Sequence, residues 1–154
     1  MPSATPSPSP SVPPSSAPAA DGVLMRSAVS GLCLGVAAGD PEGVATEQQP
    51  CADNPAQRWR AVPAGGAVTF VNVATGKCLD VNNASSDDGA KVQIWSCHDG
   101  DNQQWRSEVA GAGVQLVSVH SGKCLDVKEG QTAAGVPVQQ WSCHGEANQQ
   151  WLLG

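Results

Sequence analysis

The 154-residue sequence is poor in aromatic and in basic side chains. It has no Tyr, one Phe and five Trp, and its 8 Lys and Arg are outnumbered by 14 Asp and Glu, which gives a net charge of −6. A chain with so few basic residues lacks the positive surface that binds nucleic acid or an anionic membrane. No apolar run approaches the roughly 18–20 residues that a helix needs to cross a bilayer. We therefore expect neither a nucleic-acid nor a membrane partner.

The beginning of the chain contains almost nothing that a folded core could bury. Residues 2–20 are dominated by Pro, Ser and Ala, a mixture typical of extended, semi-rigid spacers. They also lack the basic start and the apolar centre of a signal peptide. We interpret residues 1–22 as a linker within a longer protein. Residues 23–154 then form one domain, because about 130 residues are enough for one and too few for two.

One pattern recurs three times along this domain. Each copy begins with Gly-x-Cys-Leu, continues to a second Cys and ends with Gln-x-Trp. Repetition at a fixed period indicates one structural unit packed against its own copies. The repeats cover about residues 23–65, 66–110 and 111–154. Their closing tryptophans are 46 positions apart: Trp59, Trp105 and Trp151.

The six cysteines can compensate for the small supply of large apolar side chains. Six cysteines allow 15 pairings, and a sequence does not normally choose among them. Here only pairing within each repeat treats the three copies alike. A closed loop of this length stabilises a fold by about 3 kcal/mol in the chain-entropy model. The predicted disulfides are Cys33–Cys51, Cys78–Cys97 and Cys124–Cys143.

Disulfides persist in oxidising compartments, so this pattern predicts a secreted protein. The alternative is a metal site that uses Cys97-His98 and Cys143-His144. Such a site would need closely paired ligands, such as Cys-x-x-Cys, which the sequence does not contain. We therefore expect no metal and no cofactor.

The periodicity within each repeat is that of short β-strands separated by polar turns, with no helical pattern. Four strands in each of three units could close around a pseudo-threefold axis and leave few sheet edges exposed. A propeller is the competing architecture, but three blades fall short of the usual four to eight. The expected strands are residues 23–29, 32–36, 44–48, 57–62, 68–73, 77–81, 92–95, 103–105, 114–119, 123–127, 136–141 and 149–153.

Three linked motifs in register carry a resemblance to a known family. They are Cys-Leu-Asp-Val, then Val-Gln-x-Trp, then Ser-Cys-His followed by Asn-Gln-x-Trp. The combination resembles the ricin B-type lectin domain, a Gln-x-Trp β-trefoil, and most of all the family-13 carbohydrate-binding modules attached to glycoside hydrolases. The resemblance covers about residues 23–154 and implies an all-β trefoil with one disulfide and one shallow sugar pocket per repeat. It also implies that the Trp of Gln-x-Trp is a core residue.

The resemblance places the same set of polar and aromatic residues in repeats two and three. Carboxylates and amides bind the hydroxyls of a sugar, and a flat aromatic ring covers its apolar C–H face. A Gln of the Val-Gln-x-Trp motif and the His after the second Cys are weaker members of the set. The candidate sugar-binding residues are Asp80, Gln93, Trp95, His98, Asn102 and Gln103 in repeat two, and Asp126, Gln139, Trp141, His144, Asn148 and Gln149 in repeat three.

The first repeat lacks most of this set. It has Gly35 at the Asp position, Pro50 at the aromatic position and Ala56 at the Asn position, and it keeps only Gln57. It nevertheless retains its cysteines and Trp59. The scaffold and the pocket are therefore separable, and we expect no site in this repeat.

The sequence predicts a secreted, non-catalytic module that binds galactose-type sugars or a plant polysaccharide such as xylan or arabinan. Two equivalent pockets would do so, and a catalytic domain of a larger glycoside hydrolase would precede the linker. Glycoside hydrolysis needs two carboxylates across one bond, and each predicted pocket offers one Asp. The alternative function is a structural or protein-interaction trefoil, such as an inhibitor or toxin subunit, which would have no reason to hold two matched polar pockets.

Overall fold

The computed structural model describes residues 22–37 and 42–154, which form twelve strands and five single-turn 3₁₀ helices. The predicted linker, residues 1–22, lies outside these ranges apart from Gly22. Among the described residues there is no α-helix, and no helix is long and apolar enough to span a membrane.

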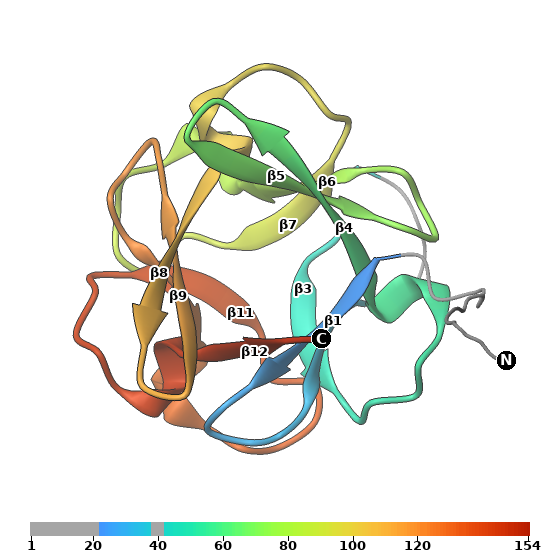
Figure 1. Ribbon diagram of the computed structural model, residues 1–154, viewed down its shortest axis with the longest axis vertical. Helices are drawn as coiled ribbons and strands as arrows, with labels where there is room; N and C mark the ends of the chain where they lie inside the picture. The colour runs from blue at the N-terminus through green and yellow to red at the C-terminus, as the bar shows by residue number, and fades with distance from the viewer. Residues whose placement is uncertain (1–21, 38–41) are drawn as a thin grey trace, which may run out of the picture.

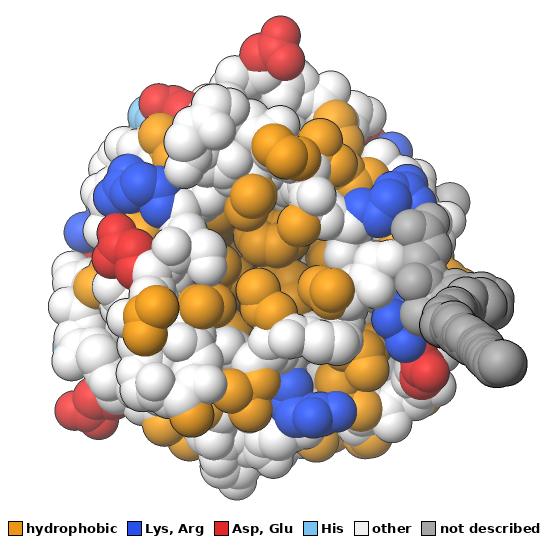
Figure 2. Space-filling view, viewed as in Figure 1, with side chains coloured by type: hydrophobic (Ala, Val, Ile, Leu, Met, Phe, Trp, Pro, Cys, Tyr) orange, Lys and Arg blue, Asp and Glu red, His pale blue; other side chains and the backbone are white. Residues whose placement is uncertain are grey.

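Six of the strands close into a barrel, because each pairs antiparallel with two others in a ring (Figure 1). Closure leaves the ring without a free edge. Figure 2 shows the same face, with apolar side chains gathered over the barrel strands near the axis and charged side chains towards the rim. In ring order the strands are β1 (Val23–Ser27), β4 (Arg58–Ala64), β5 (Ala67–Asn72), β8 (Trp105–Ala110), β9 (Gly113–Ser118) and β12 (Trp151–Leu153).

The other six strands form three hairpins around the same axis. Each hairpin is attached to the barrel by one strand pair, and bridges such as Ala45 to Gln93 and Lys91 to Gln139 join neighbouring hairpins. Every repeat contributes four strands, so the predicted all-β trefoil is confirmed. The hairpins are β2 (Cys33–Val36) with β3 (Thr46–Gln49), β6 (Cys78–Val81) with β7 (Val92–Trp95), and β10 (Cys124–Val127) with β11 (Val138–Trp141).

The start of the last strand in each repeat differs from the prediction. The Gln of Gln-x-Trp ends a 3₁₀ turn instead of beginning a strand, because its backbone N–H closes that turn, as Gln103 N does on Gly100 O at 3.1 Å. The turns are η2 (Pro55–Gln57), η4 (Asp101–Gln103) and η6 (Ala147–Gln149). Two further turns, η3 (Asn82–Ala84) and η5 (Lys128–Gly130), follow β6 and β10.

The three motif tryptophans form the centre of the core, as predicted. Trp59, Trp105 and Trp151 are fully buried. Each indole N–H donates to the carbonyl of the Leu that follows the first cysteine of its repeat, at 3.1, 3.2 and 3.0 Å. A buried Trp needs such a partner for its N–H, and this bond ties the last strand of each repeat to its first hairpin strand.

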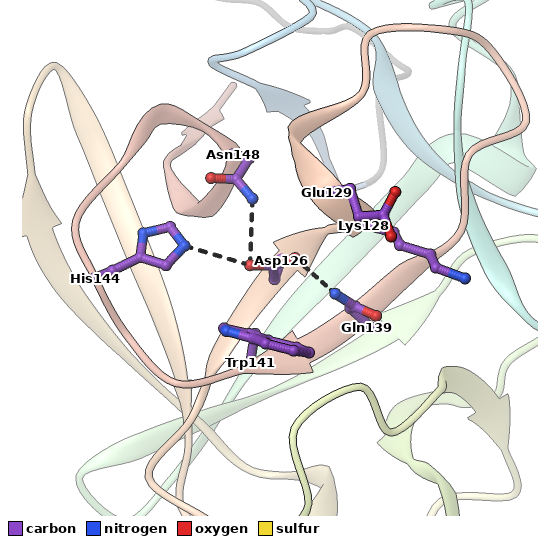
Figure 3. Close-up of a pocket in the computed structure, with 7 residues that line it drawn as sticks. All are labelled: Asp126, Lys128, Glu129, Gln139, Trp141, His144 and Asn148. Atoms are coloured by element: carbon purple, nitrogen blue, oxygen red, sulfur yellow. Dashed lines mark hydrogen bonds and ion pairs between the residues drawn. The ribbon is translucent and has the colours of Figure 1, made fainter.

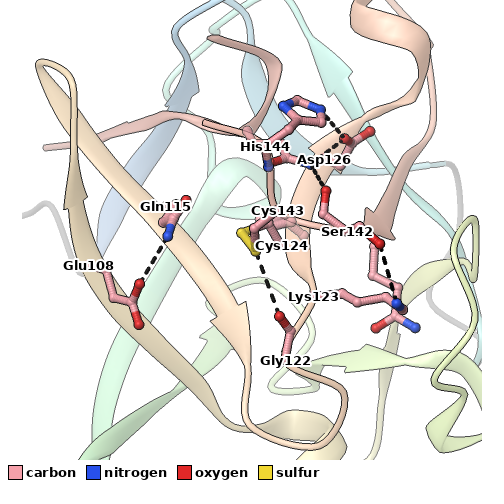
Figure 4. The surroundings of a disulfide bond; sticks show 12 residues. Glu108, Gln115, Gly122, Lys123, Cys124, Asp126, Ser142, Cys143 and His144 are labelled. Atoms are coloured by element: carbon pink, nitrogen blue, oxygen red, sulfur yellow. Dashed lines mark hydrogen bonds and ion pairs between the residues drawn. A yellow bond between two sulfur atoms is a disulfide. The ribbon is translucent and has the colours of Figure 1, made fainter. Parts of the chain in front are cut away.

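All six cysteines are paired as predicted, one disulfide within each repeat. Figure 4 shows the surroundings of the Cys124–Cys143 bond. Cys124 precedes Asp126 by two positions, and Cys143 is adjacent to His144. The bond therefore joins the strand that carries the aspartate to the loop that carries the histidine.

Candidate functional site

An aspartate occupies the same place in the hairpins of repeats two and three. Asp80 in β6 pairs with Gln93 in β7, and Asp126 in β10 pairs with Gln139 in β11. Opposite residues in an antiparallel pair project to the same side of the sheet. Each carboxylate and its partner amide therefore face one common space, although both aspartates are only 2% exposed.

The Asp80 carboxylate accepts hydrogen bonds from three side-chain amides. Its Oδ1 accepts from Gln93 Nε2 at 3.0 Å, and its Oδ2 accepts from Gln103 Nε2 at 2.8 Å and from Asn102 Nδ2 at 3.2 Å. Each oxygen has about two acceptor positions. Oδ2 is therefore saturated by the protein, whereas Oδ1 retains one free position for a ligand donor.

The third repeat reproduces this arrangement almost bond for bond. Asp126 accepts from Gln139 at 3.0 Å, from Gln149 at 2.9 Å and from Asn148 at 3.3 Å. Figure 3 shows two of these amide side chains, Gln139 and Asn148, beside Asp126. Because two different segments of the chain form the same hydrogen bonds at nearly the same distances, the carboxylate and its amide partners form one recurring arrangement.

Burial raises the pKa of both aspartates above the ordinary value, and the amide hydrogen bonds and the nearby histidine only partly offset it. Desolvation disfavours the charged form of a carboxylate. Groups with perturbed pKa values and exposed access are frequent at functional sites. Burial of Asp80 and Asp126 disfavours their charged form, so stability alone does not explain why these carboxylates are buried here.

A histidine adjoins each aspartate with a defined orientation. His98 Nδ1 accepts from the backbone N–H of Gly100 at 2.9 Å, and His144 Nδ1 accepts from Glu146 N at 3.1 Å. The neutral ring therefore carries its proton on Nε2. That nitrogen lies 3.7 Å from Asp80 Oδ2 in repeat two and 3.8 Å from Asp126 Oδ2 in repeat three, so the N–H is available to a bound molecule.

The tryptophans of Val-Gln-x-Trp are the exposed aromatics of the described residues, with Trp95 40% and Trp141 41% accessible. Each stands over a glycine of the preceding repeat. A Cβ placed on Gly43 would lie 3.5 Å from the Trp95 ring, and one on Gly89 would lie 3.7 Å from the Trp141 ring. A flat, half-open ring supported from below is a suitable platform for the apolar face of a sugar.

These residues line two hollows on the surface, of about 300 Å³ in repeat two and about 180 Å³ in repeat three. The Asp, Gln, Trp, His and Asn of each repeat are brought together as the sequence predicted. The walls also contain residues that the sequence reasoning missed, because it treated the segment after Cys-Leu-Asp-Val as a connection. They are Asn82, Asn83 and Ala84 in repeat two, and Lys128 and Glu129 in repeat three.

Gln103 and Gln149, which were expected to line the pockets, lie behind them. Both are fully buried. Gln103 Oε1 accepts from His98 N at 2.9 Å, and its Nε2 donates to Ser96 O at 3.0 Å as well as to Asp80. Gln149 makes the equivalent bonds. Each Gln therefore holds the aspartate and the histidine loop in place.

The alignment of the first repeat requires a correction. Cys33 pairs with Gln49 across the β2–β3 hairpin, as Cys78 pairs with Trp95 across β6–β7. The aromatic position is therefore held by Gln49, and the assignment to Pro50 was wrong by one residue. Gly35 and Ala56 do stand at the Asp and Asn positions.

The Gln49 side chain fills the place that the carboxylate occupies in the other repeats. A Cβ on Gly35 would lie 2.1 Å from Gln49 Oε1. The same oxygen accepts from Gln57 Nε2 at 3.1 Å, while Gln49 Nε2 donates to Val36 O and to Glu47. Gln57 thus keeps an acceptor without an aspartate, and the side chain that would be the platform closes the first pocket.

A carboxylate of repeat two binds a backbone N–H and a lysine of repeat three beside the third pocket, and we call this contact the anchor. Asp88, next to Gly89, accepts from Ser142 N at 2.7 Å and lies 3.4 Å from Lys123 Nζ. Ser142 in turn offers its carbonyl to Gln149, which holds Asp126. The preceding repeat therefore supports the carboxylate as well as the platform.

The contact between repeats one and two has the same anchor, since Glu42 accepts from Ser96 N and approaches Lys77 Nζ at 3.8 Å. The contact between repeats three and one cannot form it. Its corresponding positions offer no carboxylate, no backbone N–H and no ammonium, because they are held by Ala134, Pro50 and Leu32. The closed pocket and the missing anchor occur at the same contact.

Within the described residues, no group of three or more His, Cys, Asp and Glu side chains is placed to hold a metal ion. The third pocket does contain a second carboxylate, Glu129, which corrects the expectation of a single acid per pocket. The second pocket has Asn83 there.

The family model of the ricin-type beta-trefoil lectin domain matches residues 21–151. The chain belongs to this family. The match covers all three repeats of this lectin domain. It therefore includes the first repeat, whose pocket is closed, as well as the two repeats with open pockets. A comparison with curated protein sequences finds no match.

The solved structures that are similar to this chain include one protein of about its own length and two longer ones. ThreeFoil, a designed threefold-symmetric protein, is 41% identical with a TM-score of 0.83, over 86% of this chain and 98% of that one. An exo-beta-1,3-galactanase from Clostridium thermocellum is 32% identical with a TM-score of 0.83, over 88% of this chain and 30% of that one. The hemolytic lectin CEL-III is 30% identical with a TM-score of 0.71, over 83% of this chain and 28% of that one. The chain thus spans less than a third of the two larger proteins.

Proposed function

We propose that this lectin domain is a non-catalytic carbohydrate-binding module whose sites are the pockets of repeats two and three. The observation that carries the proposal is the duplicated arrangement of a buried aspartate, its amide partners and an open tryptophan. Its ligands are galactose-type sugars or a plant polysaccharide such as xylan or arabinan. The similarity to a galactanase and to a hemolytic lectin supports this class of ligand.

The hydrogen-bonding groups left free in repeat two support a way of holding a sugar ring. Asp80 Oδ1 has one acceptor position left, and Gln93 has used only one of its amide N–H groups. Asn102 Nδ2 is occupied by Asp80 and by Val81 O, so Asn102 presents its carbonyl oxygen. His98 adds an N–H donor, and the Trp95 face covers the apolar side. The pocket thus offers both donors and acceptors, which suits the hydroxyls of a sugar.

We further propose that the module is secreted and that it belongs to a larger polysaccharide-active enzyme. Three disulfides favour an oxidising compartment. A single shallow pocket should bind a monosaccharide weakly, with a Kd on the order of 0.1–1 mM. Two pockets on one rigid domain can add avidity of about a hundredfold on a polymer that spans both, which would hold an attached enzyme on its substrate.

Binding to galactose, lactose and immobilised xylan, arabinan and galactan tests the proposal. Calorimetry should give two sites for a simple sugar, and retention on at least one polymer should exceed what the monosaccharide affinity implies. Asp80→Ala and Asp126→Ala should each remove one site, whereas Glu108→Ala, which removes an exposed carboxylate away from the pockets, should remove none. Absence of binding to the whole panel would favour the protein-interaction alternative.

A further inference from the structure

The two pockets share their polar residues but differ in one wall. In both repeats a single 3₁₀ turn directly follows the strand that carries the aspartate. In repeat two the wall residues of this turn are Asn82, Asn83 and Ala84, and in repeat three they are Lys128 and Glu129. The expected equivalence of the sites therefore does not extend to this wall.

Glu129 has an unfavourable backbone conformation for its residue type. Its φ is 55°, and the matching Asn83 has a φ of 56°. Asn adopts this left-handed region readily, whereas a Glu there is uncommon and costs stability. The Glu129 carboxylate accepts a long hydrogen bond of 3.4 Å from Gln131 Nε2, which is too weak to offset this loss of stability. Strain of this kind at a pocket points to a role for the side chain.

The Glu129 side chain is placed to meet a bound molecule. Figure 3 shows Glu129 and Trp141 on opposite sides of Asp126 and Gln139, while the amine end of Lys128 points away from Asp126. The longer side chains of this wall accompany a smaller hollow, about 180 Å³ against about 300 Å³ in repeat two. A ring stacked on Trp141 would have Asp126 at one edge and Glu129 at another.

The two walls have different hydrogen-bonding chemistry. An ionised Glu only accepts hydrogen bonds, so it requires a ligand hydroxyl with its hydrogen. An Asn amide both accepts and donates, so it can also bind an ether oxygen. An ether oxygen replaces a hydroxyl wherever a sugar carries a glycosidic link or a branch. A carboxylate facing that oxygen has no hydrogen to accept and loses its own solvation.

Building on the proposed sugar-binding function, we propose that Glu129 is a specificity-determining residue. It restricts the third pocket to sugars with a free hydroxyl at the position it faces, whereas the second pocket accepts the same sugar with that oxygen substituted. The third pocket then selects exposed ends of a polysaccharide, and the second also takes residues within a chain or at a branch.

The test measures the two pockets separately in one intact protein. Nitrogen-15 NMR follows the exposed indole N–H of Trp95 and of Trp141, assigned with Trp95→Phe and Trp141→Phe. The probes are galactose and its four mono-O-methyl ethers, or the corresponding xylose series if xylose is the sugar that shifts the indoles. At least one ether should bind the second pocket within about threefold of the parent sugar. The same ether should lose about tenfold at the third pocket, as expected for one lost hydrogen bond to a charged group.

Exchange of the two wall residues provides matched controls. Glu129→Asn should restore binding of that ether at the Trp141 pocket, and Asn83→Glu should remove it at the Trp95 pocket. Glu129→Asn should also raise the melting temperature, because Asn suits the left-handed backbone. A gain in tolerance from this variant therefore cannot result from unfolding.

The outcomes separate this inference from the function on which it rests. If no sugar moves either indole signal, the proposed function fails and the inference with it. If sugars move both signals but every ether affects the two pockets alike, or Glu129→Asn leaves the discrimination unchanged, the function stands and the inference is overturned.

Discussion

The first repeat and its two sister repeats have the same strands, the same disulfide and the same buried tryptophan, but among the described residues only the sisters have open pockets of this kind. In the first repeat Gln49 folds into the space of the missing aspartate and supplies Gln57 with its acceptor. In repeat two Asp80 serves as that acceptor and leaves Trp95 open. The scaffold therefore requires an acceptor for this buried Gln, and the choice of acceptor decides whether a pocket exists.

The largest expected effect concerns what all repeats share. Trp105→Ala removes a fully buried ring and should lower the free energy of unfolding by roughly 3–5 kcal/mol. Trp95→Ala, on the pocket side, should remove sugar binding at that site with little change in stability. Chemical denaturation of both variants checks this pair. Equal losses of stability would show that core and platform are not separate.

Removing both aspartates should abolish binding. Asp80→Ala with Asp126→Ala takes away the acceptor at both sites, so the calorimetric signal for a simple sugar and retention on polysaccharide should both disappear. The stability cost should be only about 1 kcal/mol per site, because the surrounding amides keep other acceptors such as Ser96 O and Val81 O. Full retention by this double variant would contradict the assignment of the sites.

Giving the first repeat the pocket residues of its sister repeats tests whether a pocket can be gained as well as lost. Gly35→Asp alone should destabilise the fold, because the new side chain meets Gln49 within 2.1 Å. Adding Gln49→Trp should relieve the clash, since the space above Gly135 is open. Completing the set with Glu47→Gln, Ala52→His and Ala56→Asn should create a third weak site, visible as a stoichiometry of three. A stable variant that remains at two sites would show that the missing anchor beside this pocket also matters.

The smallest effect is a divergence between binding and stability on acidification. Burial raises the folded-state pKa of Asp80 and Asp126, so the folded protein takes up these protons before the unfolded chain does. Between the raised pKa and the ordinary value of about 3.9, the contribution of these groups to stability therefore increases as pH falls. Sugar affinity should decrease over the same window, because the carboxylate acceptors are lost.

Comparison with the double Asp→Ala variant isolates this effect. Glu42 has its pKa lowered by hydrogen bonds from Ser96 and loses stabilisation as pH falls, in both proteins alike. The melting temperature of the wild type should therefore rise relative to that of the variant on acidification, so the difference between them should grow. A difference that shrinks would contradict the raised pKa values.

The features that could be predicted from the sequence are those that recur between the repeats. The pairing of cysteines, the burial of the three closing tryptophans and the grouping of Asp80 with Gln93, Trp95 and Asn102 follow from comparing three copies. The sequence did not predict features that depend on where a side chain turns. Gln103 looks as polar as Asn102 in the sequence, and only the 3₁₀ turn directs it inwards.

The two other misses have equally local causes. Pro50 was wrongly assigned to the aromatic position because the strand register, not the distance to a motif, defines that position, which Gln49 holds. Glu129 was overlooked because its left-handed backbone turns a loop residue towards the pocket, and the residue type gives no sign of that conformation.

Because Trp95 stands on Gly43 and Trp141 on Gly89, each of the two pockets is built by two neighbouring repeats. Repeat three excised as a peptide would lack Gly89, the glycine beneath Trp141, however well it folded. Conversely, a single isolated repeat could complete such a pocket only by associating with a copy of itself, since each copy would supply the glycine for the next. Within one chain the junctions can differ, and at the junction between repeats three and one the glycine, Gly135, is present while Gln49 takes the position of the tryptophan.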